Sequence, residues 1–287
     1  MFEILEKESV SDSITRYIVR APYVARNCAA GNFVIIRVNE NGERIPLTVV
    51  EADRERGTIT LVVQSVGKTT RLLANLRAGD SIRDVVGPLG KPTSIIREGT
   101  VICVGGGVGT AEIFPIVRAL KAAGNRVLTI VGARTRSLLI LLKELEQVAD
   151  RLEIVTDDGS TGEKGVVTDV LGRLLREESC VDAVYAVGPM PMMKAVSNLT
   201  RPLNLKTIVS LNSIMVDGTG MCGGCRVSVG GKMQFACVDG PEFDGHEVDF
   251  DELMFRSQSY KEFERLADDT FRGNGAAKHE QVTAWRA

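Results

Sequence analysis

Three cysteines are crowded into one short stretch of this chain, which reads DGTGMCGGCRVSVGGKMQFAC. Cys222, Cys225 and Cys237 follow the spacing C-x2-C-x11-C, and a metal or iron–sulfur site usually takes four protein ligands. A structural zinc site would complete the set with Asp217 or with His246. An iron–sulfur cluster would use the same thiolates, with glycines that let the backbone wrap closely round it. The local spacing leaves both sites open.

A glycine-rich turn, GGGVGTAE, offers a second kind of chemistry. It runs from Gly105 to Glu112, between an expected buried strand and an expected helix. Glycines let a backbone approach a pyrophosphate, and a helix N-terminus presents free N–H groups to it. However, Thr110 replaces the third glycine of the dinucleotide fingerprint, and GART, residues 132–135, stands where an acidic ribose partner is usual, with Arg134 in it and Arg136 just after it. The turn predicts a nucleotide site, with tight packing as the alternative, and the two arginines either meet a phosphate or begin a solvated helix.

Two more segments have residue types that suit a ligand. The stretch VGPMPMM, residues 187–193, closes a strand at the carboxyl edge of the expected sheet, where ligands of open α/β sheets bind. Its methionines either face a planar ring or simply pack the core. The stretch VGKTT, residues 66–70, opens a helix with small and hydroxyl side chains, which suits an anion or merely caps the helix.

The elements that must position these residues change character along the chain. Up to about Pro92, short apolar segments with polar turns predict strands at residues 13–22, 31–39, 44–52 and 57–66. One helix, residues 68–76, interrupts them, with Leu72, Leu73 and Leu76 on one face. Several short strands with a single helix predict a small antiparallel β-barrel.

From about Gly99, strands alternate with helices. Strands are expected at residues 100–107, 126–134, 151–157, 182–188 and 206–212, and helices at 109–124, 137–149 and 166–178. This alternation predicts an α/β domain with a parallel sheet and helices on both faces. A cysteine module follows from about Ser210, and the tail is expected to be helical over residues 260–269 and irregular over 273–287.

The predicted fold class is therefore an antiparallel barrel, then a parallel α/β domain, then a small C-terminal module, with boundaries at residues 1–97, 98–209 and 210–287. The formal net charge of −2 gives no basic surface for nucleic acid or an anionic membrane. No apolar run approaches the ~20 residues that span a bilayer, and the charged N-terminus does not resemble a signal peptide. Six cysteines in 287 residues do not form a disulfide framework, so a reducing cytoplasm is expected. Cys28, Cys103 and Cys180 are expected to be ordinary buried residues.

The order of these motifs carries more information than any one of them. RIPLT and VGKTT in the barrel, GGGVG and GPMPM in the sheet, and a cysteine cluster closing in ACVDGPEF form a series over residues 1–260. This series resembles the ferredoxin–NADP reductase superfamily. Within it, the chain is similar to electron-transfer subunits related to dihydroorotate dehydrogenase, and among these to the small subunits of NADH-dependent reduced ferredoxin:NADP oxidoreductases.

The resemblance implies FAD between barrel and sheet, and NAD(H) as substrate. The implied FAD contacts are Arg44, Pro46, Leu47, Thr48, Val62, Val63, Gln64, Gly67, Lys68, Thr69 and Thr70. The implied NAD contacts are Gly107, Val108, Gly109, Thr110, Arg134, Gly188, Pro189, Met190 and Met193. One departure concerns the superfamily's Arg-x-Tyr-Ser/Thr flavin motif, because Ile45 stands in the place of its arginine and Arg44 lies one position earlier.

The resemblance also bears on the fourth cluster ligand. Plant-type [2Fe–2S] sites run C-x4-C-x2-C with a distant fourth cysteine. Laid on this chain, that pattern gives Cys222, Cys225 and Cys237 the last three places, and the first falls on Asp217. Dihydroorotate-type relatives carry cysteine there, whereas the ferredoxin:NADP-type small subunits resemble this chain in carrying aspartate. The expected ligand set is therefore three thiolates and one carboxylate.

The implied activity is that of an oxidoreductase subunit that exchanges hydride with NAD(H) and passes single electrons through FAD and a [2Fe–2S] cluster. The resemblance adds a larger partner subunit with FAD and [4Fe–4S] clusters, ferredoxin reached through that partner, and electron bifurcation. The alternatives are the electron-transfer subunit of a dihydroorotate dehydrogenase and, from another class, a non-enzymatic zinc-bearing nucleotide-binding regulator. A further expectation is that Leu253, Met254 and Phe255 form part of a contact patch for the partner.

Overall fold

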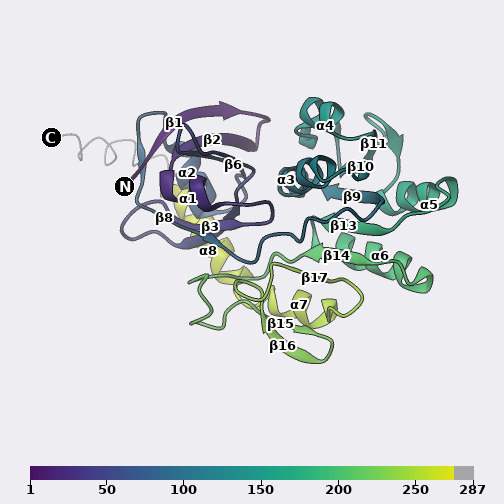
Figure 1. Ribbon diagram of the computed structural model, residues 1–287. Helices are drawn as coiled ribbons and strands as arrows, with labels where there is room; N and C mark the ends of the chain where they lie inside the picture. The colour runs from purple at the N-terminus through teal and green to yellow at the C-terminus, as the bar shows by residue number, and fades with distance from the viewer. Residues whose placement is uncertain (275–287) are drawn as a thin grey trace.

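The structure is a computed structural model, and it describes residues 1–274. The chain forms an antiparallel β domain, a parallel α/β domain and a smaller module that holds the cysteine loop (Figure 1). The irregular tail expected over residues 273–287 lies, from residue 275 on, outside the described residues. Within the described part, no helix is both long and apolar enough to cross a membrane.

The N-terminal domain consists of two antiparallel sheets around one core. The strand orders are β5-β6-β2-β1-β7 and β4-β3-β8. The strands are β1 (Phe2–Ser9), β2 (Ile14–Arg20), β3 (Phe33–Arg37), β4 (Arg44–Thr48), β5 (Glu51–Asp53), β6 (Thr58–Gln64), β7 (Ser81–Ile82) and β8 (Asp84–Leu89). Two helices, α1 (Pro22–Asn27) and α2 (Lys68–Asn75), accompany them. The expected antiparallel architecture is confirmed, although backbone pairing divides the barrel wall into two sheets.

The core of this domain is made by residues that alternate along the strands, as the two-residue period requires. Ile4, Tyr17, Val34, Ile59 and Leu61 are all buried in one cluster. Sequence reasoning missed β1 and β8, because half of the β1 residues are charged and β8 is interrupted by Gly87 and Pro88.

The α/β domain has a seven-stranded sheet of order β12-β11-β10-β9-β13-β14-β17, in which only β17 is antiparallel. The strands are β9 (Thr100–Gly106), β10 (Arg126–Ala133), β11 (Arg151–Thr156), β12 (Glu163–Lys164), β13 (Ala183–Val187), β14 (Thr207–Ser210) and β17 (Glu242–Asp244). The helices are α3 (Gly109–Ala122), α4 (Leu142–Val148), α5 (Val167–Glu177) and α6 (Met190–Thr200), with short 3₁₀ turns η1 (Arg136–Leu138) and η2 (Arg201–Leu203).

Helices cover both faces of this sheet, as the alternating pattern predicts. On one face, α3 and α4 pack against side chains such as Val101 and Cys103. On the other face, α5 and α6 pack against Ile102 and Val104. The chain leaves β9 for β10 on one side and later returns to β13 on the other, so the carboxyl ends of β9 and β13 form a topological switch point.

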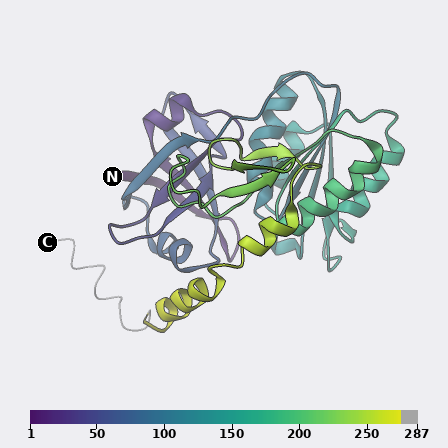
Figure 2. The same cartoon turned by 90° about the horizontal axis from the view of Figure 1, so that it is seen from below.

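The cysteine module consists of a hairpin, β15 (Arg226–Val229) and β16 (Lys232–Phe235), followed by α7 (Phe250–Arg256) and α8 (Lys261–Asn274). The module lies below the two larger domains in Figure 1, and from below it overlies the boundary between them (Figure 2). Helix α8 returns to the β domain, where Arg71 of α2 makes a 2.9 Å ion pair with Asp268. This helix runs further than the expected residues 260–269.

Two expectations about side chains are wrong. Cys180 is exposed, whereas Cys28 and Cys103 are buried as expected. Leu253 is 3% exposed and belongs to the core beneath α7, so it cannot contribute to a contact patch. Both errors have one cause, because exposure depends on neighbours that are distant in the sequence.

Candidate functional site

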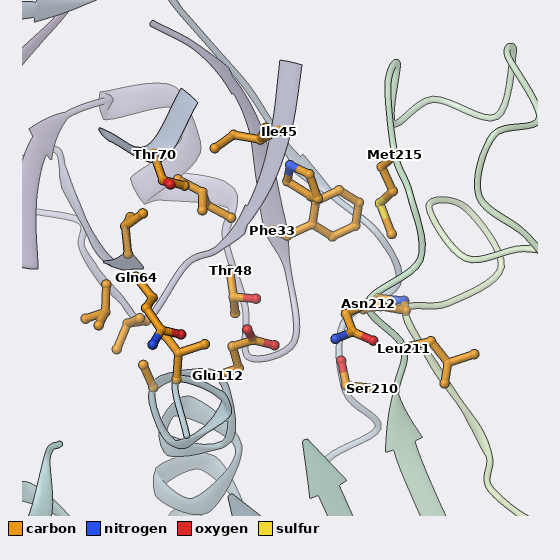
Figure 3. A pocket seen from close by; sticks show the side chains of 18 of the residues that line it. Phe33, Ile45, Thr48, Gln64, Thr70, Glu112, Ser210, Leu211, Asn212 and Met215 are labelled. Carbon is orange, nitrogen blue, oxygen red and sulfur yellow. The ribbon is translucent and has the colours of Figure 1, made fainter. Parts of the chain in front are cut away.

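A cavity of about 380 Å³ lies between the β domain and the α/β domain (Figure 3). Its walls come from three parts of the chain: strands β3, β4 and β6 with the start of α2, the first turn of α3, and the segment after β14. Pro241, next to β17, closes one side. The cavity therefore exists only where the domains meet, at the carboxyl edge of the parallel sheet.

The lining is mainly apolar, with a few polar groups, as is typical of cofactor sites. Thirteen of the twenty lining residues are apolar, among them Phe33, Leu47 and Met215. Ser213 is 5% exposed, and its hydroxyl has no hydrogen-bond partner in the described part of the chain. A buried hydroxyl without a partner costs free energy unless a ligand satisfies it. These features suit a large planar ring with a few polar edge groups, such as an isoalloxazine.

One ionisable side chain enters this cavity. Glu112, in the first turn of α3, points into the cavity toward Thr48 of β4, while Ser210 and Asn212 lie on the opposite side (Figure 3). Burial raises the pKa of the Glu112 carboxyl to about 7. The cause is desolvation, which disfavours the charged form.

The predicted FAD contacts divide into two groups in the structure. The residues that line the cavity are Pro46, Leu47, Thr48, Val62, Val63, Gln64 and Thr70. The others, Arg44, Gly67, Lys68 and Thr69, lie outside that lining. Arg44 is exposed at the start of β4, which is one residue before the lining begins at Ile45.

Several polar groups at the start of α2 are already engaged in hydrogen bonds or ion pairs within the chain. The Thr70 hydroxyl accepts hydrogen bonds from the backbone N–H groups of Val66 and Gly67, each at 3.0 Å. The Lys68 amine lies 3.2 Å from a carboxylate oxygen of Glu43, and the Thr69 hydroxyl donates to the same carboxylate. The Glu43 carboxylate thus engages the Lys68 and Thr69 side chains at this helix start.

The glycine turn after β9 combines open space with tight packing. Gly107 has φ +57°, and a Cβ there would meet nothing within 4 Å. At Gly109, a Cβ would lie 2.5 Å from the carbonyl oxygen of Val187, so this glycine lets α3 pack against the end of β13. Thr110 is 1% exposed, and its hydroxyl has no partner within residues 1–274. Val108 lines the cavity.

The segment GPMPM leads from the end of β13 into a helix. Pro189 precedes α6, which begins at Met190. Met193 is fully buried in the core, so the prediction that its side chain contacts the nucleotide is wrong. Gly188 does face the glycine turn, because a Cβ on it would lie 3.0 Å from the Cα of Gly106. The methionine side chains on this helix pack mainly against the core, Met192 included.

Arg134 follows β10 at the carboxyl edge of the sheet and is exposed. Its carbonyl accepts the N–H of Asp158 at 3.2 Å. Arg136 begins the turn η1, and its N–H donates to the Ser160 hydroxyl at 2.8 Å. Neither guanidinium group makes an ion pair within residues 1–274, so both remain available at this edge.

The cysteine loop is organised around the Asp217 carboxylate. Its oxygens accept hydrogen bonds from the Thr219 hydroxyl at 2.5 Å and from the backbone N–H groups of Thr219, Met221 and Cys222 at 3.2, 3.0 and 3.4 Å. These donors, the Thr219 hydroxyl first, hold the pKa of Asp217 below its usual value. Gly218 has φ +79°, and a Cβ there would lie 2.7 Å from Ile35 of β3. Glycine is therefore needed for both the turn and the close approach to the β domain.

The three cysteines of the loop are in unlike surroundings. The Cys225 and Cys237 sulfurs lie 3.1 Å apart and are buried, whereas Cys222 is exposed. Burial first, and then the Cys225 thiol, raise the pKa of Cys237 to about 12. The N–H of Gly224, donating at 3.4 Å, is the main reason why the pKa of Cys222 is lowered. Three soft donors and a carboxylate in one short loop fit an iron–sulfur cluster chemically.

In the described residues, no three His, Cys, Asp or Glu side chains converge into a ready metal centre. Asp217 therefore acts in this structure as the acceptor that organises the loop, and ligation by it remains a prediction. His246 is engaged elsewhere, because its Nε2 lies 2.9 Å from the Thr200 hydroxyl of α6. The zinc site completed by His246 is not assembled in this fold.

The cavity and the cysteine loop are joined by one segment. Leu211, Asn212, Ser213 and Met215 line the cavity, and Asp217 follows two residues later. Sequence reasoning missed this wall, as it missed Phe33, Ile45 and Glu112. The position of SLNS in the sequence could have indicated this wall, because SLNS lies at the end of the parallel strand β14, at the sheet edge where ligands bind.

Comparisons with known proteins agree with this division of the chain. Three family models match consecutive segments: an oxidoreductase FAD-binding domain over residues 1–93, an oxidoreductase NAD-binding domain over 103–198, and the iron–sulfur cluster binding domain of dihydroorotate dehydrogenase B over 212–249. The expected cofactor set of FAD, an iron–sulfur cluster and NAD(H) is thereby confirmed at the level of domain type.

Two curated relatives are similar over most of their length. A Thermotoga maritima protein named as a homolog of the dihydroorotate dehydrogenase B (NAD(+)) electron transfer subunit is 49% identical over 269 residues, covering 94% of this chain and 95% of the relative. A probable electron transfer subunit of the same enzyme from Methanopyrus kandleri is 34% identical, covering 76% and 80% of the two chains.

Solved structures add a three-dimensional likeness. A chain from a study of flavin-based electron bifurcation in the NADH-dependent reduced ferredoxin-NADP oxidoreductase matches with a TM-score of 0.90 and 48% identity, covering 94% of this chain and 98% of that one. Phthalate dioxygenase reductase matches with a TM-score of 0.59 at 17% identity, covering 79% and 85% of the two chains, which shows a shared fold alone.

Proposed function

The chain belongs to the family of dihydroorotate dehydrogenase B-type electron-transfer subunits, and from this premise we propose that it is the small subunit of an electron-bifurcating NADH-dependent reduced ferredoxin:NADP oxidoreductase. In this role it exchanges hydride with NAD(H) and passes single electrons to or from a larger partner subunit. The observation that carries the proposal is the likeness to a chain of that enzyme over 98% of its length, at 48% identity.

The cavity between the domains is the proposed site of the FAD ring. Bound there, FAD supplies the conversion of a two-electron hydride into single electrons, so no side chain is needed as a covalent catalyst. The apolar walls exclude water, and the unpartnered Ser213 hydroxyl can satisfy a polar edge of the ring. Thr48 points into the same space (Figure 3).

The glycine turn and the edge of the sheet are the proposed NAD(H) site. Open space at Gly107, the unpartnered Thr110 hydroxyl and the exposed Arg134 support this assignment. The positive end of the α3 helix dipole favours a pyrophosphate. Asp217, Cys222, Cys225 and Cys237 are the proposed ligands of the [2Fe–2S] cluster.

The proposed partner is a larger FAD and [4Fe–4S] subunit that communicates with ferredoxin. Helices α7 and α8 and the turn between them display large apolar side chains: Phe255, Tyr260, Phe263 and Leu266. Phe255 is 78% exposed, which keeps it in the expected contact patch although Leu253 is buried. Grouped exposed apolar residues are typical of protein interfaces. A cytoplasmic location is part of the same proposal.

Measurement of bound groups is the first test. Protein purified under anaerobic conditions is expected to hold about one FAD, with about two irons and two acid-labile sulfides per chain, as a [2Fe–2S] cluster requires. Iron, sulfide, zinc and flavin are measured on the same sample. Stoichiometric zinc without flavin would overturn the proposal and favour the regulator.

A second candidate is the electron-transfer subunit of a dihydroorotate dehydrogenase. It is favoured by the family model over residues 212–249 and by the names of the relatives. The two candidates differ in partner and reaction. The complex isolated from the source cell is expected to reduce ferredoxin and NAD with NADPH. Dihydroorotate-dependent reduction of NAD by that complex, with no NADPH activity, would instead establish the second candidate.

A further inference from the structure

Glu112 stands apart from the other residues of the cofactor cavity. Among the twenty described residues that line it, Glu112 is the only one with an ionisable side chain. The remaining polar residues are hydroxyls and amides: Thr48, Gln64, Thr70, Ser210, Asn212 and Ser213. A charge in an apolar cavity is unfavourable unless it is paired or removed by protonation, so this carboxyl needs an explanation.

No group in the described chain compensates Glu112. Its carboxyl makes no hydrogen bond or ion pair within residues 1–274, and burial is the sole cause of its raised pKa. Glu242 gives a contrast. Like Glu112, it is half-buried with a pKa raised to about 7, but it accepts a 2.5 Å hydrogen bond from the Thr93 hydroxyl and does not line the cavity. The Glu242 carboxyl is thus part of the packing, whereas the Glu112 carboxyl faces the cavity.

The other charged groups near the cavity do not compensate the Glu112 carboxyl. Those on the surrounding elements are, in chain order, Arg37 on β3, Arg44 on β4, Glu51 and Asp53 on β5, Lys68 and Arg71 on α2, Arg118 and Lys121 on α3, and Glu242 and Asp244 on β17. None of them lines the cavity. Glu51 and Arg118 form a 2.7 Å ion pair with each other, and Lys68 pairs with Glu43 at 3.2 Å. The segment of residues 210–215 contributes no ionisable side chain.

We propose that Glu112 is the charge-compensating acid of the cofactor cavity, an inference that rests on the proposed function. A hydride brings two electrons and one proton into the cavity, and therefore one net negative charge. The Glu112 carboxylate takes one proton from water at the same time, so the cavity gains two electrons and two protons and its net charge is unchanged. When the two electrons leave singly for the iron–sulfur cluster, the proton on Glu112 and the proton brought by the hydride both return to water.

The acidity of Glu112 suits this task. A pKa near 7 means that small changes in the nearby charge move the carboxyl between its two states at neutral pH. A negative charge gained by the cavity raises that pKa further, because like charges disfavour ionisation. Between the lower and the higher pKa, reduction of the cofactor is therefore coupled to proton uptake by Glu112.

The test is the pH dependence of the flavin midpoint potential in Glu112→Gln and in the unaltered chain, each measured with cofactors bound. For a two-electron couple, a tenfold change in proton activity shifts the potential by about 30 mV per coupled proton. Between pH 7 and 9, the potential of the unaltered chain is expected to fall more steeply than that of Glu112→Gln, by up to about 30 mV per pH unit. Below pH 6 the two slopes should coincide, because Glu112 is then protonated in both redox states.

Two further variants make the result specific. Glu112→Asp retains an acid and should retain the steeper slope over a shifted pH range. Glu242→Gln removes the other glutamate with a pKa raised to about 7 and should leave the slope as in the unaltered chain. Equal slopes for Glu112→Gln and the unaltered chain between pH 7 and 9, with FAD bound to both, would overturn the inference. Such a result would leave the proposed function intact, whereas absence of flavin and iron from the unaltered chain would remove the function itself.

A measurement without cofactors covers the case in which Glu112→Gln binds no FAD. In cofactor-free chain with ¹³C-labelled glutamate, NMR should show two side-chain carboxyls that titrate near pH 7. Glu112→Gln should lack one, and Glu242→Gln the other. If the signal lost in Glu112→Gln titrates near pH 4.5, Glu112 is already ionised at neutral pH and the inference fails.

Discussion

The cofactor cavity and the cysteine loop are separated by a few residues along the chain but are built in different ways. The cavity is walled by side chains from three distant segments, and its apolar lining is buried by domain packing. The loop is one local stretch, held by hydrogen bonds to Asp217 and by glycines with positive φ. Its sulfurs are only partly gathered, since Cys225 and Cys237 are in contact and Cys222 is exposed.

This difference indicates how each site responds to its cofactor. The cavity is formed by the fold and exists without a ligand. A single substitution in its wall should therefore change the polarity or charge of the cavity but leave the cavity in place. The loop supplies donors and a flexible backbone, and metal ligation supplies the energy that gathers them. Loss of one ligand should therefore remove the cluster and leave the cavity intact. The following predictions test this contrast.

The largest effect is expected for Cys225→Ser and Cys237→Ser. Each removes the sulfur of one proposed cluster ligand, so bound iron and sulfide should fall from about two of each to nearly none. Bound FAD should remain at about one per chain, because neither cysteine lines the cavity. Cys180→Ser, which changes an exposed cysteine outside the loop, is the matched control. Loss of FAD together with iron would show that the two sites are not separable.

The second effect concerns Asp217. Asp217→Ala removes the acceptor of four hydrogen bonds in the loop and should destabilise or abolish the cluster. Asp217→Cys should retain it at a lower midpoint potential, with about 59 mV for each tenfold change in the one-electron equilibrium. Redox titration followed by electron paramagnetic resonance gives both values.

Asp217→Asn separates the two roles of this residue. Its amide oxygen can still accept the loop's N–H groups, but it carries no charge for iron. A shifted potential or a lost cluster in Asp217→Asn supports ligation. An intact cluster at the original potential in both the asparagine and the cysteine variants would mean that Asp217 only organises the loop.

The third effect is a pH-dependent difference in stability at the cavity. Burial raises the pKa of Glu112 to about 7 from the ordinary glutamate value of 4.5, so between these values the folded chain holds a proton that the unfolded chain has lost. Stability therefore falls as pH rises through this window, and the loss persists above it. At about 1.4 kcal/mol per pKa unit, this loss amounts to about 3 kcal/mol.

Glu112→Gln lacks this ionisation. The free energy of unfolding of cofactor-free Glu112→Gln, relative to that of the unaltered chain, should rise by about 3 kcal/mol between pH 4.5 and pH 8. Urea unfolding at each pH measures this difference. The parallel contribution of Glu242 is present in both chains and cancels in the difference. A difference that does not change with pH would contradict the raised pKa.

The smallest effects are expected at the glycine turn. Gly109→Ala brings a Cβ to within 2.5 Å of the Val187 carbonyl oxygen, and such overpacking costs about 1–3 kcal/mol. Gly107→Ala meets no atom within 4 Å and should cost only the strain of φ +57°, about 1 kcal/mol. Urea unfolding compares the two. For NADH affinity the order should reverse, with the larger loss at Gly107, because its open side is the proposed ligand surface.

The sequence by itself determined the order of the domains, most of the regular elements and the cysteine loop. These features depend on short-range patterns: two-residue alternation in β2 and β6, the strand–turn–helix from β9 into α3, and the spacing of Cys222, Cys225 and Cys237. Asp217 could be singled out for the same reason, since its place is defined by five residues of local backbone.

Tertiary structure alone decided which side chains face the cofactor cavity. In the sequence, Glu112 looks like an ordinary acidic residue in the first turn of a helix. Its desolvation arises only because β4 and the segment after β14 pack against α3. Met193 and Leu253 were misjudged for the same reason, since exposure is set by distant neighbours. Local patterns determine backbone geometry, whereas the solvation of a side chain, and with it the pKa of Glu112, depends on everything packed round it.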